Sequence, residues 1–155
     1  MDSDDRHHYF AFFNEIGIIA QLSRALMEAR LPDGLILPHF SVINHLVRVG
    51  DGATPQKLAR AFQVPNTTMT HTLSGLESRG YVEMRRNPRD GRSKCVWLTE
   101  AGRRFREEAI ASLDPDLAFL AKRIEKAEIA GLAERLGEIR RILDAYRDEP
   151  RDGNS

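Results

Sequence analysis

Apolar positions follow a helical period over most of the chain. Over residues 9–30 they recur every three or four residues, which is typical of an amphipathic helix. A second helix is expected to begin at Pro38, because proline fits the first turn of a helix. Thr54 is a good N-cap with a proline directly after it, so a short third helix is expected over 55–62. A fourth helix is expected over 66–79.

The period changes after residue 80. Residues 81–86 and 94–98 are rich in β-forming side chains, and turn-forming residues separate them at 87–92. This pattern predicts a two-stranded hairpin with a long, basic tip. Thr99 then caps a long helix that begins at Glu100.

The C-terminal part holds a helix break and a heptad-like seam. Asp114-Pro115 is expected to break or kink the helix before a further helix over 117–124. The first helix has a second apolar stripe, beginning at residues 9–13, which a single small core would leave exposed. We therefore expect the terminal helices to pack on a second copy of the chain, with packing onto their own chain as the alternative. The seam of the last helix consists of Ile129, Leu132, Leu136, Ile139, Leu143 and Tyr146.

Two short helices joined by a tight turn and followed at once by a hairpin form the plan of a winged helix-turn-helix. The predicted fold is mainly α (α+β), with a two-stranded β-hairpin wing and long N- and C-terminal dimerisation helices. We expect a single domain over 1–155, in which 8–31 and 101–148 form the helical dimerisation region and 38–100 the winged DNA-binding region. Inside that region lie the third helix at 55–62, the recognition helix at 66–79 and the wing at 81–99.

Charge is unevenly distributed, although the net charge of the 155 residues is zero. Residues 54–106 carry 11 basic and 4 acidic side chains, a net of +7, whereas 1–53 and 107–155 have nets of −3 and −4. A basic middle between acidic flanks predicts that the middle faces a polyanion, although a solvated surface with clustered charge is the alternative.

Composition excludes several classes of protein. The single cysteine, Cys95, cannot form an intramolecular disulfide and leaves no cysteine cluster for zinc. Its place in an alternating strand predicts a small buried residue rather than a redox sensor. The acidic start and the absence of a long apolar run predict a soluble, cytoplasmic protein that does not contact a membrane.

The winged plan predicts how the chain would contact DNA. A helix N-terminus with small hydroxyl side chains, here Thr67, Thr68 and Thr70, can enter the major groove and bond to base edges. An arginine at a hairpin tip, here Arg92, can reach the negative potential of the minor groove. The threonines could instead be no more than helix-start residues, and Arg92 an ordinary exposed charge.

Three spaced motifs carry a family resemblance. They are Leu76-Glu77-Ser78-Arg79-Gly80-Tyr81-Val82, then Asp90-Gly91-Arg92-Ser93, then Val96-Trp97-Leu98-Thr99-Glu100-Ala101-Gly102. Together they resemble the core signature of the MarR family of bacterial transcriptional regulators, and the helix order is similar over nearly the whole chain.

The resemblance implies a homodimer that holds two winged domains over a pseudo-palindromic site in double-stranded DNA. It also implies a repressor that is released by a small lipophilic or phenolic effector. For base readout it points to Thr67, Thr68, Thr70, His71 and Arg92. For phosphate contact or support of the wing, the candidates are Thr54, Arg85, Arg86, Arg89, Asp90 and Lys94, of which some could instead be solvated or paired with Glu83 and Asp90.

The sequence departs from the family pattern at positions that are often basic. Met84, Gly75 and His71 stand there, so the recognition helix is weakly charged and affinity is expected to depend on the wing. The N-terminal cysteine of hydroperoxide-sensing relatives is absent, which removes that oxidation mechanism.

A further expectation is an effector pocket between the dimer helices and the winged part. Its candidate residues are Phe12, Ile16, His39, Phe40 and Ile43, and the alternative is that they are core and interface residues.

His7 and His8 lie in an N-terminus expected to be loose, and His39 and His45 are spaced wrongly for a metal pair on one helix face. No metal or cofactor is expected. Asp114-Pro115 and the turn at 50–52 are candidate hinges.

The sequence favours one of three function classes. The leading one is a dimeric DNA-binding regulator, and the alternative is a winged-helix module that docks a protein without specific DNA readout. An enzyme is not expected, because the sequence has no phosphate-binding glycine loop, no metal-ligand spacing and no nucleophile motif.

Overall fold

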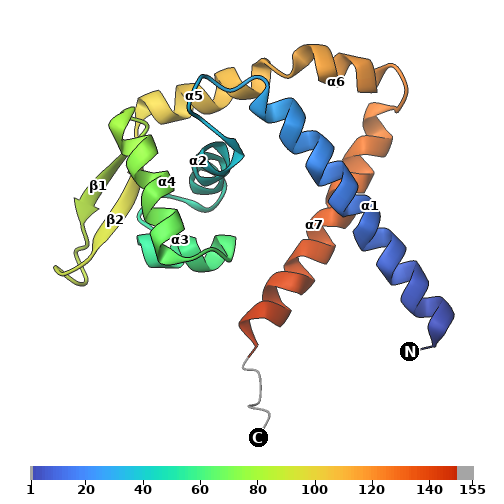
Figure 1. Cartoon of the computed structure of the whole chain (residues 1–155), viewed down its shortest axis with the longest axis horizontal. Helices are drawn as coiled ribbons and strands as arrows, with labels where there is room; N and C mark the ends of the chain where they lie inside the picture. The colour runs from blue at the N-terminus through green and yellow to red at the C-terminus, as the bar shows by residue number, and fades with distance from the viewer. Residues whose placement is uncertain (1, 150–155) are drawn as a thin grey trace, which may run out of the picture. The chain divides into compact units, whose positions relative to one another are not determined.

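The computed structural model describes residues 2–149 and gives a helical chain with one antiparallel hairpin (Figure 1). Its elements in chain order are α1 (Ser3–Glu28), α2 (Leu37–Val49), α3 (Pro55–Phe62), α4 (Asn66–Ser78), β1 (Val82–Arg86), β2 (Lys94–Leu98), α5 (Glu100–Ala111), α6 (Asp114–Ala121) and α7 (Lys126–Asp148). The predicted winged helix-turn-helix with its two-stranded wing is confirmed.

The chain divides into two compact units after Asp114. The first unit holds α1 to α5 and the hairpin, and the second begins at Pro115 and holds most of α6 and all of α7.

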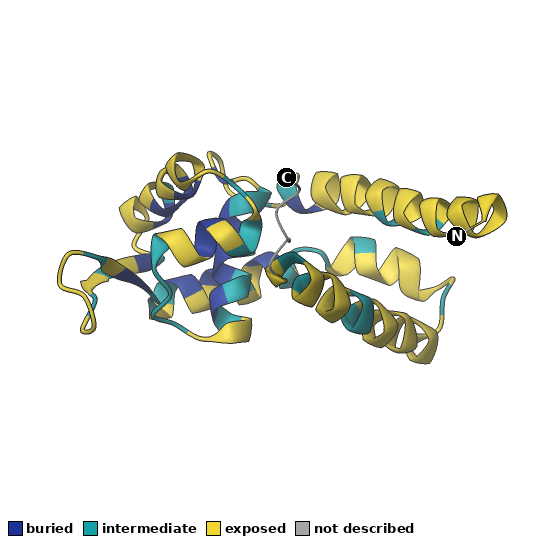
Figure 2. Cartoon of the chain, turned by 90° about the horizontal axis from the view of Figure 1, so that it is seen from below, coloured by how far each residue is buried: buried dark blue, intermediate teal, exposed yellow. Residues whose placement is uncertain are grey.

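The core lies in the winged part of the first unit. Buried residues gather on α2, α3, α4 and the hairpin, whereas α1, α6 and α7 are almost wholly exposed (Figure 2). Ile43 of α2, Leu76 of α4 and Val96 of β2 are each 0% exposed. Because such side chains leave water completely on folding, their burial is the main force that holds the helices under the hairpin.

The local signals at helix starts act as predicted. The Thr54 hydroxyl accepts the Lys57 N–H at 3.3 Å, and Pro55 takes the first position of α3. The Thr99 hydroxyl likewise accepts the Gly102 N–H at 3.0 Å at the start of α5. Each cap satisfies a backbone donor that has no partner within its helix.

The hairpin is joined to the rest of the winged part through its second strand. Val82 pairs with Leu98 at one end of the ladder and Arg86 with Lys94 at the other. Val96 of β2 also pairs with the turn before α3. Its N–H donates to the Ala53 carbonyl and its carbonyl accepts the Gly52 N–H, both at 2.9 Å. The turn before α3 therefore fixes where the wing begins.

Two expectations about helix limits were wrong, whereas the expected break before a further helix is present and lies just before Asp114-Pro115. Helix α1 begins at Ser3, where Asp2 accepts the Asp5 N–H at 2.8 Å, so His7 and His8 lie inside a helix rather than in a loose N-terminus. Helix α5 ends at Ala111, before Asp114-Pro115, and Pro115 lies in the first turn of α6. A proline is tolerated there because first-turn N–H groups have no partner within the helix. Helix α6 ends at Ala121 rather than at residue 124.

Long apolar side chains remain exposed on the terminal helices. Among the described residues, no helix combines the length and the apolar content that crossing a membrane requires. The exposed apolar residues include Tyr9, Phe10, Ile19 and Leu22 on α1 and Leu132, Leu136, Ile142 and Tyr146 on α7.

Candidate DNA interface

Helix α4 has one buried face and one exposed face. Successive residues of a helix are rotated by about 100°, so Thr67, His71 and Ser74 share one side and Thr70 lies next to them. All four are exposed. Thr70 also donates its hydroxyl to the Asn66 carbonyl at 2.8 Å, which fixes its rotamer and leaves oxygen lone pairs for an incoming donor. The buried face consists of Met69, Thr72, Leu73 and Leu76.

Thr68 lies between the two faces. Its side chain lines a small, mainly apolar cavity of about 180 Å³ with Leu37 and Phe62, and its carbonyl accepts the Thr72 hydroxyl at 3.1 Å. The structure therefore places Thr68 on a different side of α4 from Thr67, Thr70 and His71.

The tip of the wing is braced by its own side chains. Asp90 accepts the Arg92 N–H through Oδ1 at 3.0 Å, and Asn87 accepts the Arg89 N–H in the same way at 3.0 Å. Asn87 also donates through Nδ2 to the Ser93 hydroxyl at 2.8 Å. Such side-chain turns restrict the backbone, so the tip presents its arginines from a defined loop.

The cations of the tip have no polar partner among the described residues. Within residues 2–149, no hydrogen bond or ion pair engages the guanidinium groups of Arg86, Arg89 and Arg92 or the ammonium of Lys94. Arg86 lies directly opposite Lys94 in the ladder, and like charges in that position destabilise a hairpin. An anion bound beside them would relieve this repulsion.

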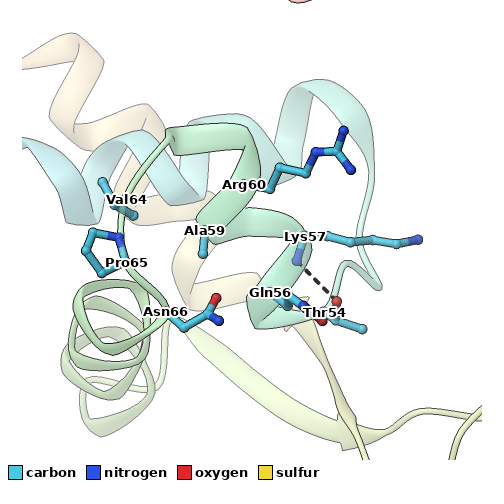
Figure 3. A pocket seen from close by; sticks show the side chains of 8 residues that line it. All are labelled: Thr54, Gln56, Lys57, Ala59, Arg60, Val64, Pro65 and Asn66. Atoms are coloured by element: carbon cyan, nitrogen blue, oxygen red, sulfur yellow. Dashed lines mark hydrogen bonds between the residues drawn. The ribbon is translucent and has the colours of Figure 1, made fainter. Parts of the chain in front are cut away.

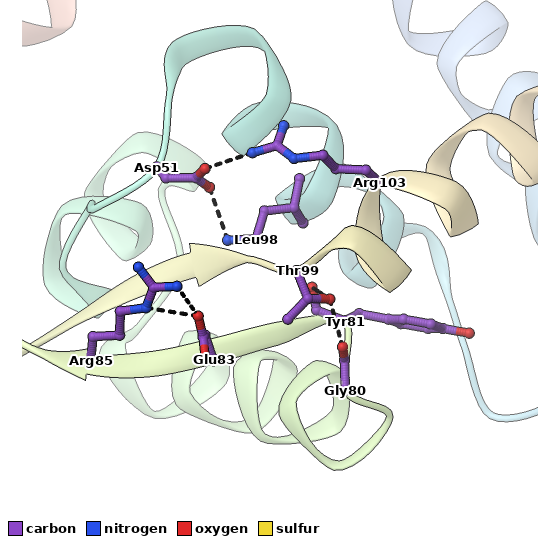
Figure 4. A network of polar contacts seen from close by, with 8 residues as sticks. All are labelled: Asp51, Gly80, Tyr81, Glu83, Arg85, Leu98, Thr99 and Arg103. Atoms are coloured by element: carbon purple, nitrogen blue, oxygen red, sulfur yellow. Dashed lines mark hydrogen bonds and ion pairs between the residues drawn. The ribbon is translucent and has the colours of Figure 1, made fainter.

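Arg85 differs from the other basic residues of the wing. Its guanidinium pairs with Glu83 (Figure 4). It also lies over the Trp97 ring, 4.7 Å from the ring centroid. Of the open alternatives for this residue, the structure shows pairing with Glu83.

A concave surface connects the start of α3 with the start of α4 and continues into a hollow that reaches the tip of the wing. Figure 3 shows Thr54, Gln56 and Asn66 around its centre, with Lys57 and Arg60 along α3. An adjoining hollow is lined by Thr54 and Asn66 together with Asp90 and Lys94. Helix N-termini and nearby cations favour anions, so this surface suits a phosphate backbone.

Polar contacts hold the base of the wing on the body of the unit. The Asp51 carboxylate accepts the Leu98 N–H at 2.9 Å and pairs with Arg103 of α5 at 2.7 Å (Figure 4). The Thr99 hydroxyl bonds to the carbonyls of Gly80 and Tyr81, at 2.6 and 3.1 Å. Both ends of the hairpin are thereby tied to fixed elements.

Comparison with known proteins finds similarity to one family of regulators. The sequence model of the MarR family matches residues 33–93, which run from the turn before α2 into the wing. The crystal structure of wild-type MarR in its apo form, from E. coli, is 26% identical with a TM-score of 0.67, and the match covers 81% of this chain and 94% of that one. The chain is therefore similar to the MarR family in sequence over residues 33–93 and in fold over most of its length.

Two further similar proteins extend the comparison. A mutant MarR from E. coli, crystallised in complex with operator DNA, is 26% identical with a TM-score of 0.65 over 90% of this chain and 99% of that chain. The uncharacterized HTH-type transcriptional regulator YdcH of Bacillus subtilis (strain 168) is 30% identical over 94 residues, or 59% of this chain. That match spans 64% of the length of YdcH. The family resemblance is thus confirmed, and the MarR family comprises transcription regulators rather than enzymes.

The residues predicted for an effector pocket are not gathered around a described cavity. Phe40 and Ile43 are part of the core, and Phe12 and Ile16 lie half-buried along α1. The cavity of about 180 Å³ is lined by their neighbours on α2 and by residues of α1, α3 and α4. His39 is buried at the start of α2, where its Nδ1 accepts the Ile36 N–H at 3.1 Å.

Sequence reasoning about this chain missed two groups of residues. Gln56, Lys57 and Asn66 line the concave surface, and the signal for them was their position at the starts of two consecutive helices. Asp51 and Arg103 had no signal, because they are 52 residues apart. Cys95 is buried, as its strand alternation predicted.

Proposed function

We propose that this protein is a sequence-specific regulator of transcription that binds double-stranded DNA. One observation carries the proposal: Arg92 is exposed on a braced hairpin, and its guanidinium has no partner among residues 2–149. It lies in the same compact unit as the exposed Thr67, Thr70 and His71 side of α4. In this arrangement α4 would read base edges in the major groove and Arg92 would enter the minor groove. Thr68 would contribute from the flank of α4.

Phosphate contacts would come from the rest of the wing and the start of α3. Arg86, Arg89 and Lys94 carry charges without partners among the described residues, and Thr54 lines the hollow next to them. Asp90 would act by holding the tip in shape through the Arg92 N–H. Arg85 would contact phosphate only after its ion pair with Glu83 breaks, so its contribution to DNA affinity is expected to be small.

A homodimer on a pseudo-palindromic site is the assembly that the surface supports. Exposed apolar patches of this extent on long helices are typical of interfaces. Leu22 of α1 is 63% exposed and Ile142 of α7 is 67% exposed in the single chain. A second copy would cover such residues and place two winged units on one DNA duplex.

Repression and its release complete the proposal. A homodimer on its operator would block transcription from a chromosome in the cytoplasm. A small lipophilic or phenolic effector would release the dimer from DNA by binding better to an arrangement that does not fit the operator. The shift between the two arrangements cannot exceed the difference in the effector's affinity for them.

The test is a fluorescence-anisotropy titration with a duplex that the protein selects from a random pool. Affinity is expected to fall steeply with salt, since each neutralised phosphate releases counterions. Arg92→Ala is expected to lose about 1–3 kcal/mol of binding with the fold intact. Arg135→Ala, which removes an exposed arginine of α7, is the control and should keep full affinity. A salt slope near zero, or equal affinity for heparin, would reject specific DNA readout in favour of a protein-docking module.

A further inference from the structure

Helix α2 begins with a histidine in place of a usual cap. His39 is the third residue of α2 and only 8% exposed, and its Nδ1 accepts the Ile36 N–H at 3.1 Å. Only an imidazole nitrogen with a lone pair can accept this bond. The ring therefore sits in this place in its neutral form, with its proton on Nε2.

The other edge of the same ring contacts helix α4. A methyl group added at Gly75 would lie 2.8 Å from Nε2 and 3.4 Å from Cδ2 of His39. Glycine in the middle of a helix costs about 1 kcal/mol relative to alanine, so its presence leaves room for the imidazole. His39 thus links the first turn of α2 directly to the middle of α4.

The surroundings of His39 disfavour a second proton. Burial is the main cause that lowers the pKa of His39 below its ordinary value of 6.5, and Arg79, the residue after α4, and His71 of α4 add to it. Arg79 is fixed in place, because it donates to the Asp33 carbonyl at 2.8 Å. The carboxylate of Glu28, the last residue of α1, accepts the Leu37 N–H at 2.9 Å and pairs with Arg24 at 3.2 Å.

We propose that His39 is a positioning residue for α4, and that protonation of its imidazole releases α4 from the start of α2 and weakens DNA binding. This inference rests on the proposed function of α4 as the DNA-reading helix.

Protonation would act through two local changes. A proton on Nδ1 would face the Ile36 N–H, so a hydrogen bond would become a contact between two donors. It would also place a charge in a buried position beside Arg79. The ring would turn out of its site, and α4 would lose its contact at Gly75 while keeping the tie from Arg79 to Asp33.

The first arm of the test measures DNA affinity against pH. Anisotropy with a labelled duplex, selected by the wild-type chain from a random pool at about pH 8, is followed down to about pH 5.5. One proton per chain changes affinity by at most about tenfold per pH unit, and we expect a total loss of about three- to tenfold for the wild type. His39→Asn keeps an acceptor for the Ile36 N–H but cannot titrate in this range, so its affinity should lack this loss.

A matched control separates His39 from its neighbour. His71→Asn removes the other histidine near this site, and a proton there would favour DNA rather than oppose it. The fold-loss of DNA affinity at low pH in His71→Asn should therefore equal or exceed that of the wild type, whatever the affinity of this variant at high pH. An unchanged pH profile in His39→Asn would overturn the proposal.

The second arm needs no DNA. In NMR titrations of the unbound wild-type chain, the Gly75 amide resonance should move with the same midpoint as the His39 ring, below 6.5. If no duplex binds but Gly75 follows His39, the proposed function fails and the positioning role stands. If Gly75 does not follow His39, the positioning role is wrong, even if the protein binds DNA or His39→Asn fails to fold.

Discussion

Asp51 and Arg103, 52 residues apart in the chain, form an ion pair at 2.7 Å that joins the turn before α3 to the first turns of α5. The other carboxylate oxygen of Asp51 accepts the N–H of Leu98, the last residue of β2. One side chain thereby holds three parts of the winged unit together. It lies at the base of the wing, so it helps determine the direction in which the wing projects.

Replacing Asp51 should separate the two contacts. Asp51→Ala loses both and should lower the free energy of unfolding by about 1–3 kcal/mol, because a buried backbone donor is left without a partner. Asp51→Asn can still accept from Leu98 and should lose no more than about 1 kcal/mol, the usual value of a partly exposed ion pair. Urea denaturation would measure both. Equal stability of the two variants would show that the bond to Leu98 contributes nothing.

Gly102 should not tolerate a side chain. A Cβ at this position would lie 2.2 Å from the carbonyl oxygen of Tyr81, which is backbone and cannot move without shifting the hairpin. Gly102→Ala should therefore destabilise the fold by about 1–3 kcal/mol, although alanine is the better helix former. Gly131→Ala on α7 is the control, because nothing lies within 4 Å of its Cβ, and it should stabilise the helix instead.

Gly75 and His39 should be coupled in a double-mutant cycle. Gly75→Ala alone should destabilise the protein, because its methyl group would overlap His39 Nε2 at 2.8 Å. With His39→Ala already present, the same change should gain about 0.5–1 kcal/mol from helix propensity. Thermal or urea unfolding of the four proteins would give the coupling energy. Additive effects would contradict the contact.

Stability should decrease in acid because of His39. Its pKa in the folded chain lies below the ordinary value of 6.5, so the unfolded chain binds the proton first as the pH falls. The contribution of His39 is therefore complete above 6.5 and is lost as the pH drops below that value. Unfolding midpoints measured along this range should decline less in His39→Asn than in the wild type. The opposite order would show that the protonated ring is accepted in the fold.

The exposed stripe on α1 should control the oligomeric state. Leu22→Asp would place a charge on the apolar face of α1 and should convert a dimer into single chains of 17.6 kDa, as measured by light scattering after gel filtration. Gln21→Asp adds the same charge to an exposed residue one position away and should leave the dimer intact. A wild-type chain that is already monomeric at high concentration would remove the homodimer from the proposal.

The sequence by itself determined the elements and their order, because the signals involved act between residues a few positions apart. The caps at Thr54 and Thr99 and the turn at 87–92 are such signals, and the structure contains a helix start or a hairpin at each. The same local patterns carried the family resemblance. The reading of Thr67, Thr68, Thr70, His71 and Arg92 as DNA contacts also came from the sequence and stays a prediction.

Only the tertiary structure decided which of these residues share a face and what holds them there. It placed Thr68 beside the cavity under α2, engaged Arg85 with Glu83, and brought Asp51 to Arg103 and His39 to Gly75. The last two pairs lie 52 and 36 positions apart, so no local pattern could have revealed them. Such contacts form because burial of the core packs α2, α4, α5 and the hairpin together, and packing depends on all these elements at once.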